Sequence, residues 1–355
     1  MYTILSINPG STSTKIALFK DKELVFSETL RYDTSQLKQY KRIIDQLDFR
    51  TKTILEILKD KGIAISDLDA IVGRGGLLKP IESGTYEVNE KMIEDLKEAK
   101  RGEHASNLGG IIAYSLAKEH AIPAYIVDPV VVDELEEVAR ISGMPEIEKM
   151  SIFHALNQKA IARRLSADLG KSYTDANLII AHLGGGISVG AHKRGRVVDV
   201  NDALNGEGPF SPERAGGLPV LDFAKLCFSG SYTYDEIKKK LIGQGGIAAH
   251  LGTNDVREVY KKIEKGDKKA ELILDAMAYQ TAKEIGAMAA VLEGKVDGIG
   301  ITGGIAYNND FVERISKRVK FIAPIKIYPG EDEMIALMEG AYRVLTGEEK
   351  AKVYN

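Results

Sequence analysis

The hydrophobic and polar positions of the first thirty residues follow the pattern of a three-stranded β-meander. Apolar runs cover Tyr2 to Ile7, Lys15 to Phe19 and Leu24 to Thr29. The segment "NPGSTST" separates the first two runs and "KDKE" separates the last two, and both are rich in turn-forming residues. The pattern therefore predicts three consecutive antiparallel strands, with four hydroxyl side chains at the first turn.

The same pattern occurs a second time, in "NLIIAHLGGGISVGAHKRGRVVDV" at residues 177–200. Asn8 and His182 end the first strands of the two copies and are 174 positions apart (182 − 8). The later turns at Asp21 and Arg194 are 173 positions apart (194 − 21). Two copies at this separation indicate a duplicated domain, and a chance likeness between two β-meanders is the alternative.

The rest of the chain predicts an α/β fold. Short apolar strands are expected in residues 67–76 and 122–130, and a largely helical stretch at about 234–292. The Gly- and Pro-rich residues 201–220 predict a long loop of the kind that is usually functional or disordered. A closing helix is expected from Glu333 to Leu345.

We expect two domains, each a mixed five-stranded sheet flanked by helices, with a cleft between them. The closing helix is expected to pack back on the first half of the chain. The first domain would then comprise residues 1–149 and about 333–355, and the second domain residues 150–332.

Composition narrows the class of protein. The 355 residues carry a net charge of −3, which offers no general attraction to nucleic acid or to an anionic membrane. There is no apolar run long enough to span a bilayer. Cys227 is the only cysteine, and the N-terminal residues do not read as a leader peptide, so we expect a cytoplasmic protein.

Four glycine turns follow apolar strands, at Gly10, 73–76, 184–186 and 303–304. Successive backbone N–H groups in such turns can bind an anion, because no Cβ stands in the way. None of the turns has the spacing of a P-loop, and each one alone is more often a structural turn. The match between the first and third turns favours phosphate binding.

Positive and hydrogen-bonding side chains lie beside these turns. Arg74 stands inside the second turn, Arg214 lies in the long loop, and His182 ends the strand before the third turn. Phosphoryl transfer mainly requires positive charge and hydrogen-bond donors around the moving group. The alternatives are surface arginines and a core histidine. His104 and His154 have plainer alternatives still, as helix-face or packing residues.

A magnesium ion would need one or two carboxylates in addition to phosphate and water. Asp128, after a short strand, and Glu333, at the start of the last helix, are the candidates. Glu331 and Asp332 stand beside Glu333, and the sequence leaves open which of the three is nearest to a metal. An acidic cluster at a helix start also simply complements the helix dipole.

Five motifs in order, "NPGSTSTK", "GRGG", "HLGGG", "PERAGG" and "ITGGIAYN", cover nearly the whole chain. Together they resemble the acetate and butyrate kinase family, whose members belong to the actin-like ATPase superfamily of duplicated ribonuclease-H-like domains. The resemblance implies transfer of the ATP γ-phosphoryl group to a carboxylate, with ATP and Mg²⁺ bound. It also implies a homodimer or a higher homo-oligomer.

The resemblance also implies roles for particular residues. The first domain would hold the acyl and phosphate groups, and the second domain the nucleotide. Arg74, Arg214, His182, His154 and Asp128 resemble the active-site residues of the family, and Asp128 and Glu333 its metal-linked acids. The residues that resemble its nucleotide-binding positions are Asn8, Ser11, Ser13, Lys15, Gly184, Gly185, Gly186, Asp255, Arg257, Gly303, Gly304 and Asn308.

Three departures from acetate kinases bear on the substrate. Gly185 stands where they typically carry asparagine, "SIFHAL" replaces their usual "GFHG", and the chain is shorter. These features resemble the butyrate-kinase branch, which implies an acid of roughly four or five carbons. The alternatives are an acetate, propionate or branched-chain fatty acid kinase. A non-catalytic actin-like protein that binds partners under the control of ATP is the alternative from another class.

Overall fold

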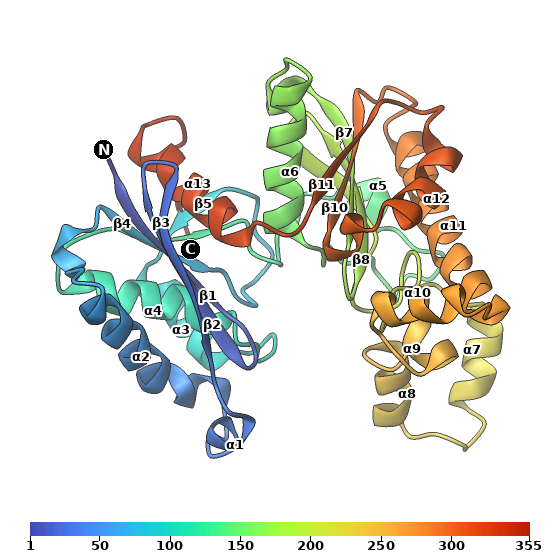
Figure 1. The fold of residues 1–355 in the computed structure, drawn as a ribbon, viewed down its shortest axis with the longest axis horizontal. Helices are drawn as coiled ribbons and strands as arrows, with labels where there is room; N and C mark the ends of the chain where they lie inside the picture. The colour runs from blue at the N-terminus through green and yellow to red at the C-terminus, as the bar shows by residue number, and fades with distance from the viewer. The chain divides into compact units, whose positions relative to one another are not determined.

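Both predicted β-meanders are present in the computed structural model, which describes residues 1–355 (Figure 1). The hairpin turns at Asp21 and Arg194 both adopt positive φ, 51° and 49°. Each meander also has one register shift at its second hairpin, at Leu18/Phe19 and at Ala191/His192. The two copies therefore repeat in backbone detail as well as in hydrophobic pattern.

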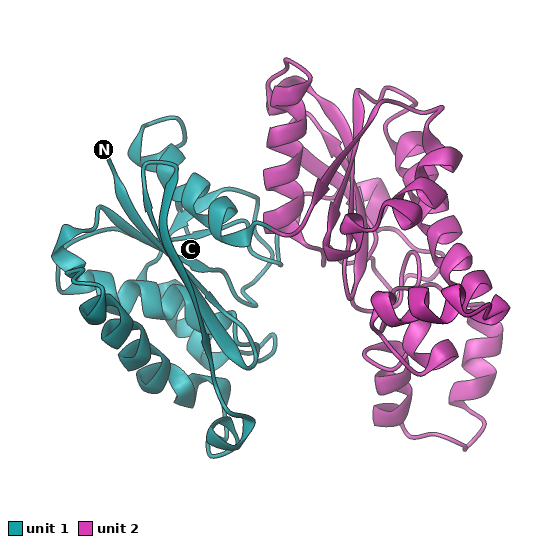
Figure 2. Cartoon of the chain, viewed as in Figure 1, with its two compact units in different colours: residues 1–132, 332–355 teal, residues 133–331 magenta.

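The chain divides into two units, which Figure 2 colours separately. Unit 1 comprises residues 1–132 and 332–355, and unit 2 comprises residues 133–331. We expected residues 133–149 in the first domain, but they group with unit 2. Lys149 Nζ bonds Asp199 Oδ1 at 2.6 Å, and Glu136 N donates to Val198 O at 3.0 Å, so this segment is fastened to the second meander.

The sheet of unit 1 has seven strands in the order β12-β5-β6-β4-β1-β2-β3. Its strands are β1 (Thr3–Pro9), β2 (Ser13–Lys20), β3 (Glu23–Arg31), β4 (Ala70–Arg74), β5 (Thr85–Glu87), β6 (Ala124–Val127) and β12 (Lys352–Val353). β1, β2 and β3 are antiparallel, and β4 and β6 continue the sheet in parallel with β1. Five strands were expected, and β5 and β12 are short additions at one edge.

The sheet of unit 2 has the five strands that were expected, in the order β11-β10-β7-β8-β9. They are β7 (Asn177–Leu183), β8 (Ile187–Lys193), β9 (Arg196–Val200), β10 (Gly298–Gly303) and β11 (Ile325–Pro329). β7, β8 and β9 are antiparallel, and β10 and β11 run parallel to β7. This is the arrangement of β1, β2, β3, β4 and β6, so the topology of the sheet is duplicated.

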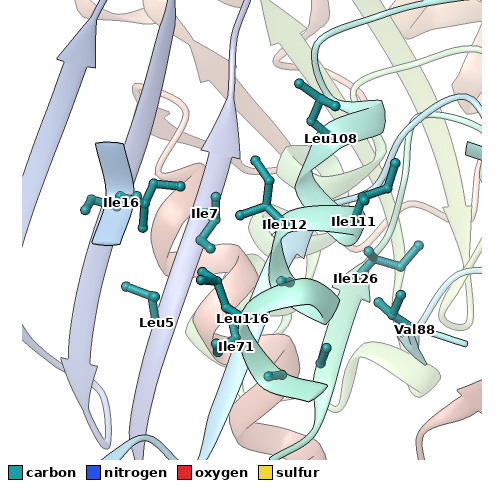
Figure 3. Close-up of a cluster of buried hydrophobic side chains, with 14 of the residues drawn as sticks. Leu5, Ile7, Ile16, Ile71, Val88, Leu108, Ile111, Ile112, Leu116 and Ile126 are labelled. Carbon is teal, nitrogen blue, oxygen red and sulfur yellow. The ribbon is translucent and has the colours of Figure 1, made fainter. Parts of the chain in front are cut away.

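Helices cover both faces of the unit 1 sheet. They are α1 (Thr34–Leu37), α2 (Leu47–Asp60), α3 (Glu90–Glu98), α4 (Asn107–Lys118) and α13 (Glu333–Leu345). On one face α4 packs beside α2 and α3 over a core that includes Leu5, Ile7 and Ile112 (Figure 3). On the other face α13 packs on β1, where Ser6 Oγ donates to Met334 O. The expected closing helix is confirmed.

The helices of unit 2 also lie on two faces of its sheet. They are α5 (Glu137–Arg140), α6 (Ala155–Asp168), α7 (Val220–Cys227), α8 (Tyr234–Leu241), α9 (Gly246–Leu251), α10 (Val256–Glu264), α11 (Lys268–Val291) and α12 (Asn309–Val319). Alternate residues of β7 pack against α11 (Ile179, Ala181) and against α6 (Leu178, Ile180). No helix combines the length and the apolar content that crossing a membrane requires.

The helical stretch expected at 234–292 is broken into four helices. Gly243, Gly252 and Gly266 have φ values of 100°, 72° and 87°, a conformation that ends a right-handed helix. The loop expected at 201–220 is confirmed up to the start of α7, because residues 201–219 form neither helix nor strand. This loop holds Arg214.

Candidate functional site

In unit 1, candidate residues gather where the parallel strands end. Asn8 lies near the end of β1, Arg74 is the last residue of β4, and Asp128 follows β6 directly. Because parallel strands end at the same edge of a sheet, residues distant in sequence come together there. The first residue of α13, Glu333, is brought to the same edge.

Glu333 connects Asn8 and Arg74. Asn8 Nδ2 donates to Glu333 Oε2 at 2.6 Å, and Arg74 Nη1 lies 2.8 Å from Oε1 and 2.9 Å from Oε2. The side chains of Arg74 and Glu333 are 32% and 19% exposed, so the pair is only partly screened by water. Arg74 is thus held at the sheet edge with part of its guanidinium accessible.

The glycines around Arg74 serve helix packing. A Cβ at Gly73 would lie 2.1 Å from Gly109 O, and one at Gly76 would lie 2.5 Å from Asn107 Cα. The backbone of α4 therefore touches the end of β4 directly, which only glycine permits. This close contact positions Arg74, and the "GRGG" turn has a structural explanation that does not require an anion.

His104 also lies close to Arg74, although the sequence favoured a packing role for it. Its Nδ1 is 2.8 Å from Ser106 Oγ, and burial followed by the charge of Arg74 lowers its pKa below the ordinary value. A neutral imidazole beside an arginine is a candidate hydrogen-bonding group for the site. No motif signalled this, because Arg74 ends β4 and His104 lies thirty residues later, in the turn before α4.

The candidate metal ligands are hard oxygen atoms with existing partners. Asp128 is 1% exposed, and its Oδ1 accepts from Gly84 N at 2.7 Å. Glu333 is already paired with Arg74. No three acidic, histidine or cysteine side chains gather as a metal site. A hard cation that binds together with the phosphates of a ligand needs only one or two carboxylates from the protein, and Asp128 and Glu333 fit that need.

Two acidic residues at this edge of the sheet, Asp128 and Asp332, have strained backbone conformations. Asp128 has φ of 37°, and Asp332, immediately before Glu333, has φ of 32°. Such values are unfavourable for residues other than glycine, and they persist where the surrounding structure enforces them, often at functional sites.

The first hydroxyl-rich turn is short, because β1 extends through Pro9 and β2 begins at Ser13. Ser11 is exposed and Ser13 half-buried. Lys15 is exposed and pairs with Asn8 across the two strands, so their side chains lie on the same face of the sheet. The structure thus places hydroxyl and ammonium groups around the strand end that carries Asn8.

In unit 2, His182 occupies the end of β7 on the face covered by α6. Its Nδ1 lies 2.7 Å from Asn157 Oδ1, while Asn157 Nδ2 donates to Glu331 O at 3.1 Å. That second bond orients the amide, so the Nδ1 atom of His182 must be the donor to Oδ1.

The other ring nitrogen of His182 is available. His182 is 1% exposed, and its Nε2 makes no hydrogen bond, although Glu331 Oε1 lies 3.4 Å away. Buried polar atoms nearly always have partners, so an unpartnered one points to a ligand.

His154, before the first residue of α6, stacks on His182 with ring centroids 3.8 Å apart and planes within 10°. Its Nδ1 lies 2.9 Å from Ser188 Oγ. Gln158 Nε2 donates to the same hydroxyl at 2.8 Å, and Gln158 Oε1 accepts from His192 Nε2 at 3.0 Å. Buried side chains of Ser188, Gln158 and His192 therefore form a hydrogen-bonded network that begins at His154.

The third glycine turn packs against Arg214. A Cβ at Gly186 would lie 2.0 Å from Arg214 Nη1, so only glycine leaves room for the guanidinium. Ser211 Oγ bonds Gly185 O at 2.5 Å, and Arg214 Nη1 donates to Ala203 O at 2.5 Å.

The guanidinium of Arg214 is incompletely satisfied. Its Nε is buried without a partner, and burial lowers the pKa of the group from its ordinary value. Arginine stays charged despite such shifts, so Arg214 is a cation that a phosphate or carboxylate oxygen can satisfy.

Beside this turn lies a pocket of about 730 Å³, within the usual range for small-molecule sites. Its lining residues are Gly184, Gly185, Pro212, Glu213, Asn254, Asp255, Val256, Arg257, Gly304, Ile305, Tyr307, Asn308 and Glu331. Six predicted nucleotide-binding residues are among them. Gly303 is not among the lining residues, and its φ of 92° and close approach to Leu183 O require glycine.

Two of the predicted residues at the pocket also cap helices. Asp255 Oδ1 accepts from Arg257 N at 2.8 Å, and Asn308 Oδ1 accepts from Phe311 N at 2.9 Å. The Arg257 side chain, followed by its backbone N–H, lowers the pKa of Asp255 to about 2. The sequence reasoning missed Tyr307, a 71% exposed aromatic ring in the pocket lining. An aromatic residue after a glycine turn could have signalled it.

Comparison with known proteins identifies the family. The model of the acetokinase family matches residues 147–346. Butyrate kinase 2 of Clostridium acetobutylicum is 59% identical over 353 residues, which are 99% of each chain. Butyrate kinase 1 of the same organism is 59% identical over 354 residues, or 100% of each chain. The chain belongs to the acetokinase family.

The acetokinase fold is seen in solved structures as well. The crystal structure of Porphyromonas gingivalis acetate kinase matches with a TM-score of 0.79 and 20% identity, over 96% of this chain and 99% of that one. At this identity the match shows the fold alone, the duplicated actin-like architecture. In this acetokinase chain, Asn8, Arg74 and Glu333 come together in unit 1, and Gly186 and Arg214 in unit 2.

Proposed function

We propose that this chain is a butyrate kinase, which transfers the γ-phosphoryl group of ATP to butyrate and yields butanoyl phosphate and ADP. The observation that carries the proposal is 59% identity along the whole chain to two proteins named butyrate kinase. The buried, unpartnered Nε2 of His182 beside a glycine turn and a pocket supports it.

The acceptor of the proposed reaction is an anion, and the site chemistry suits one. A carboxylate is ionised at neutral pH, so its oxygen can attack the γ-phosphorus in line without a general base. The new bond is C(O)O–P, and the bond to the β-phosphate oxygen breaks. Arg74 in unit 1 and Arg214 in unit 2 are the cations proposed to orient the acid and to offset charge on the equatorial oxygens.

His182 is proposed to donate a hydrogen bond to the moving phosphoryl group. Asn157 fixes the proton on Nδ1, so a donor at Nε2 requires the doubly protonated imidazolium. A phosphate anion would stabilise that cation. The stacked ring of His154 holds the imidazole plane in place.

ATP is proposed as the phosphoryl donor and Mg²⁺ as the divalent cation. Asp128 and Glu333 are the residues proposed to hold the ion, directly or through water. When bound, Mg²⁺ would neutralise part of the phosphate charge in the reaction. We also propose a cytoplasmic location and self-association of the chain.

The test is an acyl-hydroxamate assay with ATP across acetate, propionate, butyrate, isobutyrate, pentanoate and hexanoate. We expect the highest kcat/KM for butyrate, with partial use of its neighbours, because one methylene changes binding by about 1–3 kcal/mol. A preference for acetate would overturn the substrate, and no product with any acid would overturn the kinase.

A matched pair of arginine variants checks the site in the same assay. Arg74→Ala should lower kcat by roughly two to three orders of magnitude, the typical loss for one charge-stabilising donor. Arg31→Ala, at an exposed position of β3, should leave the rate unchanged. Equal kcat values for the two variants would show that Arg74 does not stabilise the transition state.

A further inference from the structure

Arg50, in the first turn of α2, is a buried cation without an acidic partner. The residue is 0% exposed, and its guanidinium makes six hydrogen bonds. These run from Nε and Nη2 to Gln46 Oε1 (3.0 and 2.9 Å), from Nη1 to Gly10 O, Ser13 O and Thr14 Oγ1 (2.9, 2.8 and 3.0 Å), and from Nη2 to Ser11 O (3.1 Å). Buried charges are normally paired with an opposite charge.

The partners of Arg50 are concentrated on one loop. Three carbonyls of the turn between β1 and β2, those of Gly10, Ser11 and Ser13, converge on the guanidinium. The central carbon of the guanidinium lies over the ring of Tyr32, 4.8 Å from the ring centroid. The first hydroxyl-rich turn is thus built around this cation.

Convergence of the carbonyls sets the direction of the amides. In a planar trans peptide, the C=O of one residue and the N–H of the next point in opposite directions. With the carbonyls of Gly10 and Ser11 turned toward Arg50, the N–H groups of Ser11 and Thr12 are directed away from it. No hydrogen bond within the chain uses these two N–H groups, and both residues are exposed.

We propose that Arg50 is a positioning residue for phosphate binding: it holds the Gly10–Ser13 turn with two adjacent N–H groups outward and adds a fixed positive charge behind them. The inference rests on the proposed function, because the ligand is the phosphate chain of a nucleotide. Adjacent outward N–H groups form an anion nest, and the cation behind them strengthens the field that an anion meets. The turn can therefore present a positive potential to phosphate although the arginine itself is buried.

The alternative is that Arg50 only stabilises the fold, and a matched pair of variants on one helix separates the two. Arg50→Ala removes the cation and its bonds. Ile54→Ala, one turn later on α2 and equally buried, creates a cavity away from the loop. The dissociation constant of ATP is measured by calorimetry beside the melting temperature of each variant.

We expect Arg50→Ala to weaken ATP binding by roughly tenfold to a hundredfold, the usual worth of hydrogen bonds to a charged group. About 20 mM guanidinium chloride, far below denaturing concentrations, should restore part of the affinity, whereas equal NaCl should not. Ile54→Ala should lower the melting temperature and leave the affinity unchanged. Equal affinity in the two variants would overturn the proposal.

Two further measurements keep the test decisive. If Arg50→Ala does not fold, Arg50→Lys is measured instead. Lysine keeps the positive charge but lacks the planar guanidinium that bonds several carbonyls at once, so this variant should bind ATP more weakly than wild type. In wild type, a non-hydrolysable ATP analogue should slow hydrogen exchange in a peptide spanning residues 10–14, and unchanged exchange there would overturn the proposal. If wild type binds the analogue with this protection but phosphorylates no acid, the kinase fails and the role of Arg50 stands.

Discussion

At the scale of single residues, His182 shows how a side chain is prepared for a ligand. Asn157 accepts from Nδ1, the ring of His154 stacks on one face, and Nε2 is left buried without a partner. Each contact removes a degree of freedom from the imidazole, so it needs little reorganisation when an anion arrives.

His182→Asn should therefore lower kcat by roughly a hundredfold to a thousandfold, because one donor to the transferring group is lost. Steady-state kinetics with ATP and butyrate measures the effect. His120→Asn, at an exposed position after α4, is the control and should behave as wild type. A loss below threefold in His182→Asn would show that Nε2 takes no part in the transition state.

Tyr307 is an aromatic residue of the pocket lining that was not selected from the sequence. Its ring is 71% exposed at the pocket lining, and stacking of a base on an aromatic ring is worth about 1–3 kcal/mol. Tyr307→Ala should raise KM for ATP roughly fivefold or more and leave KM for butyrate unchanged. Tyr234→Ala, at a similarly exposed tyrosine of α8, is the matched control. An unchanged KM for ATP would mean that the base binds elsewhere.

At the scale of elements, the turn between β7 and β8 is packed to fit one side chain of the long loop. A Cβ at Gly186 would overlap the Arg214 guanidinium, yet the φ of Gly186 is not in the left-handed region. The glycine is therefore required for space and not for backbone conformation. The turn and the loop act as one unit.

Gly186→Ala should consequently displace Arg214 and reproduce most of the loss of activity in Arg214→Ala. Because both changes remove the same interaction, the double variant should lose little beyond either single variant. Rates of the two single variants and the double variant form the test. Gly286→Ala, in α11 with open space around it, serves as the steric control. If the losses of activity in the two single variants added up in the double variant, Gly186 and Arg214 would act independently.

The elements of unit 2 are also joined by a buried polar chain. Burial is the main reason that the pKa of His192 lies well below its ordinary value, so the ring is neutral in the folded protein. Its Nε2–H donates to Gln158 Oε1 in α6, and its Nδ1 accepts from Tyr173 O–H at 2.8 Å. Protonation of Nδ1 would turn that nitrogen into a donor to the Tyr173 hydroxyl oxygen and would leave a charged ring in a fully buried place.

The buried, neutral His192 predicts that the stability of the protein depends on pH. Below about pH 6.5 the unfolded histidine binds a proton that the folded one does not, so the free energy of unfolding falls as pH decreases, by up to about 1.4 kcal/mol per unit. Urea unfolding between pH 7 and 5 measures this slope. In His192→Gln the slope should be smaller by one proton, and the same slope in both proteins would contradict the assignment.

At the scale of the whole molecule, the sequence was sufficient for what depends on local pattern. The paired meanders, the loop that holds Arg214 and the closing helix all follow from periodicity and turn residues. Apart from the packing of the closing helix on the first half of the chain, the sequence could not predict contacts that join distant segments. His104 beside Arg74, Arg50 behind the first turn, and residues 133–149 on the second sheet depend on tertiary packing, which no local spacing encodes.

Self-association is the prediction that belongs to the whole chain. Helix α7 buries none of its residues, and Val220, Leu221 and the following Phe228 are 78%, 72% and 91% exposed. Exposed apolar side chains on one element are typical of an interaction surface, and we propose a second copy of the chain as the partner of α7. Light scattering after size exclusion should give at least twice the 38.8 kDa chain mass. Leu221→Asp with Phe228→Asp should reduce the mass to 38.8 kDa, whereas Leu272→Asp, at a 67% exposed leucine of α11, should not. A monomeric wild type, or an oligomer that survives the paired change, would exclude α7 as the interface.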